Sequence, residues 1–222
     1  LGWSLDDKTE VLSPAEQIAH FSLERVNKAA ASFDPKKLVS FQERYMQALS
    51  VDERLALTLP FVEQAGWIPS PASAADREKV RGIVAAASDR IKVSGDILDY
   101  DEFFVADEAL AYDPKAFDKR IRGAAGAPAL LAELRSAIAA LPSDAPFDAA
   151  AVETLLNDFV AARGLGLGAI VHAVRVAVAG KPVGFGLFDI LALLGSARVL
   201  ARLARTLRVL EATANPPEVS GS

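Results

Sequence analysis

The residues best suited to binding a ligand lie near the C-terminus, where the stretch "RVAVAGKPVGFGLF" covers residues 175–188. An apolar helical pattern stops here, and a turn with three glycines follows: Gly180, Gly184 and Gly186. Such a turn can cradle a phosphate on its backbone amides, form a surface loop for another ligand, or let two helices pack closely. It is neither a P-loop nor a dinucleotide fingerprint, because no Gly-Lys-Ser/Thr follows it and no strand is predicted before it.

A second candidate site is a row of arginines in "GSARVLARLARTLRVL". Arg198, Arg202 and Arg205 are spaced by four and three residues, so they share one face of a predicted helix. Guanidinium groups bind phosphates bidentately, so this face, together with Lys181, is a predicted contact for a nucleic-acid backbone. The alternative is a helix face that is merely solvated, and the sequence leaves both interpretations open.

The distribution of charge points to the same region. The net charge is -5, but the acidic and basic residues are segregated. Residues 96–118 carry eight acidic side chains and one lysine, whereas residues 163–210 carry seven basic side chains and one aspartate. A polyanion is therefore expected to meet the C-terminal third of the chain.

Side chains suited to catalysis or metal binding are scarce. His20 and His172 lie in different predicted helices without carboxylates at metal-ligand spacing, so both are interpreted as packing or surface residues. The chain has no cysteine, which excludes disulfides and thiolate sites and fits a reducing cytosol. The acidic run "DILDYDEFFVADEAL" lacks the alternating ligands and central glycine of a calcium loop. No catalytic residue, metal site or cofactor is predicted in this chain.

The elements that must position these residues are predicted to be helices. Hydrophobic residues make up 51% of the 222 residues, alanine and leucine dominate, and strand signals are weak. The predicted fold class is therefore all-α or mostly α. Capping residues mark helix starts, and three of the four precede a proline: Ser13, Asp34 and Asp113, with Asp52 as the fourth. Further helices are predicted over residues 51–65 and 74–91. Another helix is predicted to end at Gly164, and two more flank the glycine turn.

Helix-breaking residues in the sequence suggest how the chain is organised. The stretch "GWIPSPASAADREKV", residues 66–80, is the best candidate for a linker, and residues 213–222 are predicted to be a disordered tail. No run approaches the roughly 18 apolar residues of a membrane span, and no signal peptide is recognised at the start. No membrane partner is predicted, and a cytoplasmic location is expected.

Three ordered motifs resemble bacterial-type glutamyl-tRNA synthetases. The segment "HAVRVAVAGKPVGFGLFDILALLGSARVLARL" resembles the C-terminal signature of that family. The opening "LGWS" with "FSLERVNKAAASFDPKKL" is similar to the segment downstream of its second catalytic signature, and "YDPKAFDK" is similar to a middle segment. The resemblance covers the chain from Leu1 to about Glu211.

The resemblance implies an architecture that lacks the catalytic fold. Residues 1–66 match the end of the stem-contact region, and residues 67–142 and 143–212 match two helical subdomains of the anticodon-binding region. The family's catalytic signatures, histidine-x-glycine-histidine and a Lys-Met-Ser-Lys-Ser loop, do not occur in this sequence. ATP and Mg²⁺ would act in the parent enzyme rather than in this chain.

The resemblance also implies roles for individual residues. Arg175, Gly184, Phe185 and Leu187 match positions that meet the anticodon loop, where Phe185 or Leu187 would lie against a base face. Arg90 matches an arginine linked to reading the third anticodon base. Two other readings compete: Lys92 could take that role instead, and Arg90 could be a charge that favours a helix C-terminus.

Some positions depart from the family pattern. Ser40 and Gln42 replace a tryptophan and an asparagine, which puts the stem contacts in doubt. Ala173 replaces a proline and Ala179 a threonine, which bears on the geometry of the turn but leaves Arg175 in place.

Two functional classes follow. The favoured one is tRNA recognition, with a glutamate tRNA and the parent's catalytic domain as partners. The alternative is a free-standing, non-catalytic relative that serves as a protein-interaction or regulatory module. The first residue is leucine rather than methionine, which favours a piece of a longer ligase.

Overall fold

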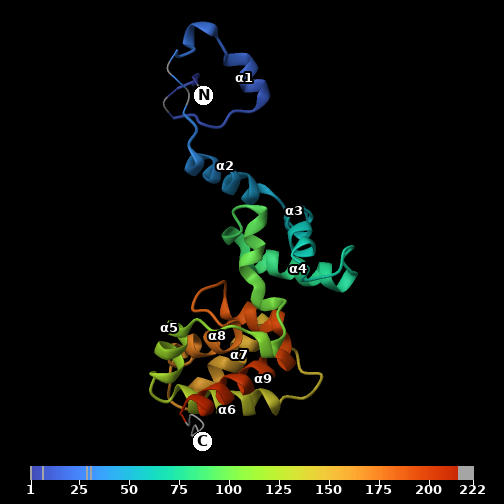
Figure 1. The fold of residues 1–222 in the computed structure, drawn as a ribbon, viewed down its shortest axis with the longest axis vertical. Coiled ribbons are helices and arrows are strands. Elements are labelled where there is room, and N and C mark those ends of the chain that lie inside the picture. The colour runs from blue at the N-terminus through green and yellow to red at the C-terminus, as the bar shows by residue number, and fades with distance from the viewer. Residues whose placement is uncertain (1, 7, 29, 31, 215–222) are drawn as a thin grey trace, which may run out of the picture. The chain divides into compact units, whose positions relative to one another are not determined.

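The computed structural model describes residues 2–6, 8–28, 30 and 32–214, which divide into two compact units, Leu1–Gln42 and Glu43–Ser222 (Figure 1). Throughout these described residues the regular elements are helices, with no strand. The predicted all-α fold class is therefore confirmed. No helix in the described part of the chain is long and apolar enough to cross a membrane.

The first unit contains α1 (Pro14–His20), the 3₁₀ turn η1 (Leu23–Arg25) and the beginning of α2 (Pro35–Ala48). Ser13 caps α1 in a capping box with Glu16, and the Asp34 carboxylate accepts the first free N–H groups of α2, as the sequence predicts. None of the described residues of this unit is buried. Large apolar side chains remain exposed, among them Ile18, Leu23 and Phe33.

The second unit begins with a helical pair, α3 (Val51–Gln64) and α4 (Ala74–Ala87), which pack on each other. Ser50 caps α3 through a capping box with Glu53, so the predicted opening by Asp52 is wrong by two residues. Asp52 instead lies in the first turn, where its negative charge interacts favourably with the positive end of the helix dipole.

Residues 66–73 connect α3 to α4 and pack closely. The Trp67 ring stacks on Phe104 with centroids 5.1 Å apart, Ile68 is buried, and the Ala72 N–H donates to the Glu63 carboxylate at 2.8 Å. The division between compact units therefore lies at residues 42 and 43 rather than in this stretch. The boundaries near residues 66 and 142 stay predictions about subdomains within the second unit.

Short helical turns lead from α4 into the C-terminal bundle. They are η2 (Ser88–Arg90), η3 (Ser94–Phe103), η4 (Asp107–Ala109), the single turn α5 (Pro114–Phe117) and the π-helical turn η5 (Asp118–Arg122). Asp113 caps α5 as predicted, accepting the Ala116 N–H at 2.7 Å. The acidic segment of the sequence is thus folded into short turns that lie against longer helices.

The bundle is built around α9. Its helices are α6 (Ala127–Ala139), α7 (Ala149–Ala161), α8 (Val171–Ala179) and α9 (Leu187–Ala214), with the turn η6 (Leu167–Ala169) before α8. Helix α9 packs against α6, α7, α8 and α4, and Figure 1 shows it in red among the other bundle helices. Gly195, with φ 75° and ψ 159°, interrupts α9. Residues 213 and 214, predicted to belong to a tail, are the end of this helix, and the rest of that prediction lies outside the described residues.

Candidate functional site

The glycine turn between α8 and α9 is fixed at its start by close packing. Gly180 ends α8 in the left-handed conformation, with φ 76°, and its carbonyl accepts the Asp113 N–H at 2.7 Å. A Cβ at this position would overlap the Ala111 carbonyl oxygen. Among the three uses that the sequence left open, the structure therefore supports close packing for Gly180.

The end of the turn is held by Arg175 of α8. Its guanidinium Nη1 donates to the Phe185 carbonyl oxygen at 2.8 Å. Gly184, with φ 148°, lies against the same guanidinium, since a Cβ there would be 3.4 Å from Nη1. The structure thus brings together Arg175, Gly184 and Phe185, three of the residues that the sequence singled out.

The Phe185 side chain lies where the sequence did not suggest. It is 1% exposed and stacks on Phe103, with centroids 5.6 Å apart and rings inclined by 3°, while Tyr100 packs against it at 5.4 Å. Leu187 is buried as well. The expectation that one of these side chains faces a base is wrong for this conformation. The Phe185 ring and the Leu187 methyl groups are instead buried in the apolar core, where removing them from water stabilises the fold.

Val183 is an exposed apolar side chain of the turn that the sequence analysis missed. It is 69% exposed and lines a cavity of about 340 Å³ together with residues from η2 and η3. The lining residues are Arg90, Asp99, Tyr100, Glu102, Lys181, Val183 and Gly184. The cavity therefore forms where the turn meets the short helices that follow α4.

Arg90, which the family resemblance singled out as a possible reader of the third anticodon base, lines this cavity. Its side chain is 51% exposed, and its Nη1 lies 3.7 Å from Asp89 Oδ1. The pKa of the half-buried Arg175 is lowered by burial and, after that, by the positive charge of Arg90. Lys92, the competing candidate, pairs with Glu43 at 3.1 Å. Two like-charged guanidinium groups thus act on one another beside the cavity, whose lining also contains the carboxyl groups of Asp99 and Glu102.

Lys181 is held by oxygen atoms of η3. Its ammonium group donates to Asp101 Oδ1 at 2.8 Å and to the Asp99 carbonyl, and Glu102 Oε2 lies 2.8 Å away. Although burial alone lowers the pKa of Lys181, the hydrogen bonds to Asp101 and Glu102 outweigh it and raise the pKa. The predicted phosphate contact is not available while these carboxylates neutralise the lysine.

Arg202 does not belong to an exposed arginine face, contrary to the prediction. Its side chain is 0% exposed, although the sequence analysis placed it in a phosphate-binding row. It pairs with Asp107 Oδ1 at 2.7 Å and donates to the carbonyls of Val178 and Glu102, the latter at 2.7 Å. Burial lowers the pKa of Arg202, and the hydrogen bond to Asp107 opposes that effect. Arg202 therefore joins α8, α9 and η3 inside the molecule.

The other two arginines of the row are also engaged. Arg198 pairs with Asp107 at 3.0 Å and donates to the backbone carbonyls of Phe103, the last residue of η3, and Val105. Arg205 lies over the Tyr112 ring, 4.8 Å from its centroid, with Glu108 3.9 Å away. The acidic segment 96–118 and the arginines of α9 therefore neutralise each other, and the expectation that α9 offers a free basic face is wrong.

Glu102 is a buried carboxylate beneath the turn, 2% exposed. Burial raises its pKa above 4.5, and the interactions with Lys181 offset this only in part. Between pH 4.5 and the raised value the folded state holds more protons than the unfolded state, so stability falls as pH rises through this window.

The variant Glu102→Gln should therefore gain stability relative to the wild type as pH rises from about 4.5 toward neutrality. The other carboxylates titrate in both proteins and cancel in the comparison. Urea denaturation at a series of pH values measures the difference in the free energy of unfolding. Parallel pH profiles for the two proteins would contradict the raised pKa.

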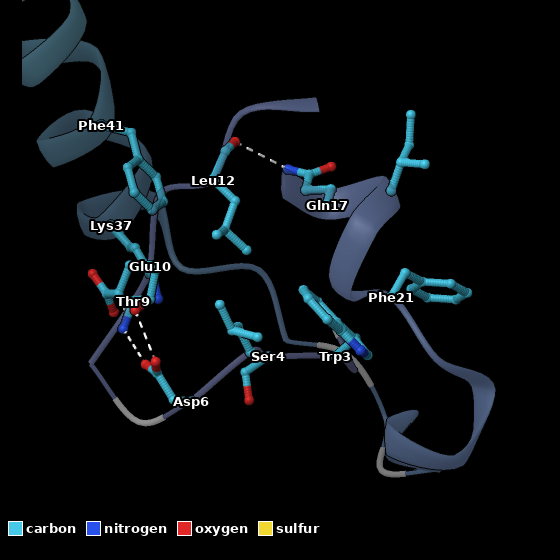
Figure 2. A pocket seen from close by; sticks show the side chains of 12 residues that line it. Trp3, Ser4, Asp6, Thr9, Glu10, Leu12, Gln17, Phe21, Lys37 and Phe41 are labelled. Carbon is cyan, nitrogen blue, oxygen red and sulfur yellow. Dashed lines mark hydrogen bonds and ion pairs between the residues drawn. The ribbon is translucent and has the colours of Figure 1, made fainter. Parts of the chain in front are cut away.

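The first unit holds a larger hollow, of about 810 Å³, which the sequence did not predict (Figure 2). Trp3 and Phe21 contact each other on its wall, 5.9 Å between centroids, and Lys37 pairs with Glu10 at 2.7 Å. The pKa of Asp6 is lowered chiefly by the hydrogen bond from the Thr9 backbone N–H, so its carboxylate is an ionised turn cap. These contacts stabilise the local fold and form no catalytic set.

In the described part of the chain, no three histidine, aspartate or glutamate side chains are arranged so that they could hold a metal ion. His20 and His172 are exposed and belong to different units.

Comparison with known proteins identifies the family. The anticodon binding domain family matches residues 53–207. Two curated glutamate–tRNA ligases, from Moorella thermoacetica and Thermobifida fusca, are 37% and 35% identical and match 94% and 96% of this chain. The chain spans 41% and 43% of their lengths.

Solved structures agree with these relatives. The crystal structure of a glutamate tRNA ligase from Elizabethkingia meningosepticum superposes with a TM-score of 0.79 at 27% identity, over 95% of this chain and 39% of that one. The resemblance drawn from the sequence motifs is confirmed. The chain belongs to the anticodon binding domain family and matches about two fifths of a glutamate–tRNA ligase.

Proposed function

We propose that this chain binds the anticodon loop of a glutamate tRNA, as the recognition part of a glutamate–tRNA ligase. The observation that carries the proposal is the pairing of Arg175 with the exposed turn at Gly184, beside the cavity that Arg90 lines. Single-stranded bases are recognised in such places, where a base leaves its stack and meets a guanidinium and an apolar surface.

The cavity suits one unstacked base. Its volume of about 340 Å³ lies within the range of small-ligand sites, roughly 300 to 1,000 Å³. Val183 offers an exposed apolar contact for a base face, in the role that the sequence analysis gave to Phe185. Arg90 is half-exposed and can donate to a base edge or a phosphate, and Arg175 contributes positive charge while it holds the turn.

Phe185 and Leu187 keep a supporting role in this proposal. Phe185 anchors the turn on η3 through its ring contacts, and Leu187 begins α9 from within the core. The residues proposed to touch RNA are therefore Arg90, Arg175, Val183 and Gly184, all of which border the turn or its cavity.

The wider role follows from the relatives. We propose that the parent protein attaches glutamate to its tRNA with ATP and Mg²⁺ in the cytoplasm, and that residues 1–66 contact the tRNA stem. The matched relatives are named glutamate–tRNA ligases, and none of the reported matches favours the free-standing, non-catalytic module.

The decisive experiment compares two tRNA transcripts. Binding of the chain to a glutamate tRNA and to a copy altered only in the anticodon is measured by fluorescence anisotropy at one fixed salt concentration. We expect a clear preference for the native anticodon. Equal binding to both would reduce the interaction to backbone attraction and overturn the proposal.

Replacing Arg175 or Arg90 by alanine should weaken binding of the native transcript by about 1–3 kcal/mol and reduce the preference for its anticodon. A matched control is Arg135→Ala, since Arg135 is exposed on α6 and does not line the cavity. This control should leave the preference unchanged. Equal weakening for both transcripts in the Arg90 and Arg175 variants would show phosphate contacts without base recognition.

A further inference from the structure

The ammonium group of Lys181 lies in a cage of η3 oxygens. Asp101 Oδ1 and Glu102 Oε2 are each 2.8 Å from Nζ, and the Asp99 carbonyl accepts a further hydrogen bond. Two of these oxygens, Asp101 Oδ1 and the Asp99 carbonyl, accept hydrogen bonds from the ammonium group, and Glu102 Oε2 neutralises it as an ion pair. Lys181 is therefore used inside the protein and is poorly suited to be a ligand for phosphate.

The cage ties the glycine turn to η3 at the point where the turn leaves α8. Gly180 is fixed by Asp113, and Phe185 is fixed by Arg175 and by its ring contacts. Between these anchors, residues 182–184 are exposed. The placement of this exposed stretch over the cavity therefore depends on the residue that precedes it, Lys181.

Burying the Glu102 carboxylate in this cage is unfavourable in free energy. A carboxylate that is 2% exposed loses its hydration, and pairing with one lysine at best offsets that loss. An apolar side chain could fill the same volume without this penalty. A buried pair of this kind is better explained by the geometry that it fixes than by the stability that it adds.

We propose that Glu102 and Lys181 are positioning residues for the anticodon site, which hold the turn so that Val183 and Gly184 border the cavity beside Arg90. The pair touches no RNA and acts through the turn. This inference rests on the proposed function for its biological meaning, but the positioning itself is a property of the protein alone.

The first test therefore uses the chain without RNA. Hydrogen exchange is measured for the two amides that donate to the ends of the turn, Asp113 to the Gly180 carbonyl and Ile190 to the Gly186 carbonyl, in the wild type, Lys181→Met, Glu102→Gln and the double variant. Each single variant should accelerate exchange of these amides by about tenfold, and the double variant by no more than either, because both remove one coupled interaction. Unchanged exchange of these amides would overturn the proposal.

A matched control separates this effect from the general loss of an ion pair. Glu133→Gln removes the pair between Arg163 and Glu133, 2.6 Å apart, which does not line the cavity. It should leave exchange of the two amides unchanged. Lys181→Arg keeps the positive charge and should restore part of the protection.

The second test measures the anticodon preference of the same variants. Lys181→Met and Glu102→Gln should each reduce the ratio of affinities for native and altered transcripts by about tenfold, with the salt dependence unchanged. If Lys181 were a phosphate ligand, Lys181→Met would weaken both transcripts equally and lower the salt slope by about one, and Glu102→Gln would strengthen binding. That result would overturn the proposal.

The two tests also separate this inference from the proposed function. A wild-type chain without anticodon preference would refute the proposed function, while the exchange data would still decide whether the pair positions the turn. A wild-type preference combined with unaltered exchange of the two amides in both variants would refute the positioning role alone. Thermal unfolding of each variant confirms that the comparison is made on folded protein.

Discussion

Replacing Arg202 by methionine should lower the free energy of unfolding of the chain by about 3–5 kcal/mol. Methionine fills much of the same space but leaves the buried carbonyls of Val178 and Glu102 without their charged donor. Asp107 keeps its contact with Arg198 at 3.0 Å, so the two carbonyls account for most of the loss.

Unfolding by urea is monitored by circular dichroism. The dependence of the free energy of unfolding on urea concentration is compared between the variants. Arg208→Met is the matched control, because Arg208 is on the same helix and pairs with Glu108 at 2.8 Å but is 58% exposed. That variant should change the free energy of unfolding by only about 0–1 kcal/mol. Similar effects for the two variants would contradict the assignment of Arg202 as an internal link between helices.

The burial of Arg202 shows where sequence analysis of α9 failed. The spacing of the arginines on one face was correct, but Arg202 also falls between Val199, Leu203 and Thr206, which are all buried. Those positions follow the three- and four-residue steps of a core-facing stripe. The residue type suggested solvent, whereas the spacing already indicated the interior.

Helical spacing alone did not reveal which segment packs against this stripe of α9. The sequence showed an acidic block and a basic block of almost equal size, and each was interpreted alone. Contacts such as Arg202 with Asp107, separated by 95 residues, are tertiary and are not specified by helical periodicity. The two opposite blocks were nevertheless a signal that they could neutralise each other.

Local features were predicted far better. Ser13, Asp34 and Asp113 cap helices as expected, because a cap needs only the residue and its next three neighbours. The structure places Arg175 against Gly184, which the family resemblance grouped with it, while their contact with an anticodon loop stays a prediction. Phe185 was misjudged because its burial depends on Tyr100 and Phe103, which lie in a distant part of the sequence.

Replacing Gly180 by alanine should lower the free energy of unfolding by roughly 2–6 kcal/mol, since two separate penalties of about 1–3 kcal/mol apply. The first is conformational, because Gly180 has φ 76°, where an L side chain is strained. The second is steric, because the new Cβ would overlap the Ala111 carbonyl oxygen, which belongs to backbone and cannot rotate away. Thermal and urea denaturation measure the total effect.

Gly126 provides a control that separates the two penalties. Its φ is 77°, almost the same as that of Gly180, but a Cβ there would have no heavy atom within 4 Å. Gly126→Ala should therefore show only the conformational penalty, of about 1–3 kcal/mol. The difference between the variants measures the overlap with the Ala111 carbonyl. If the two variants were equally destabilised, the close approach of the turn to residues 111–113 would not be real, and Gly180 would serve only to end α8.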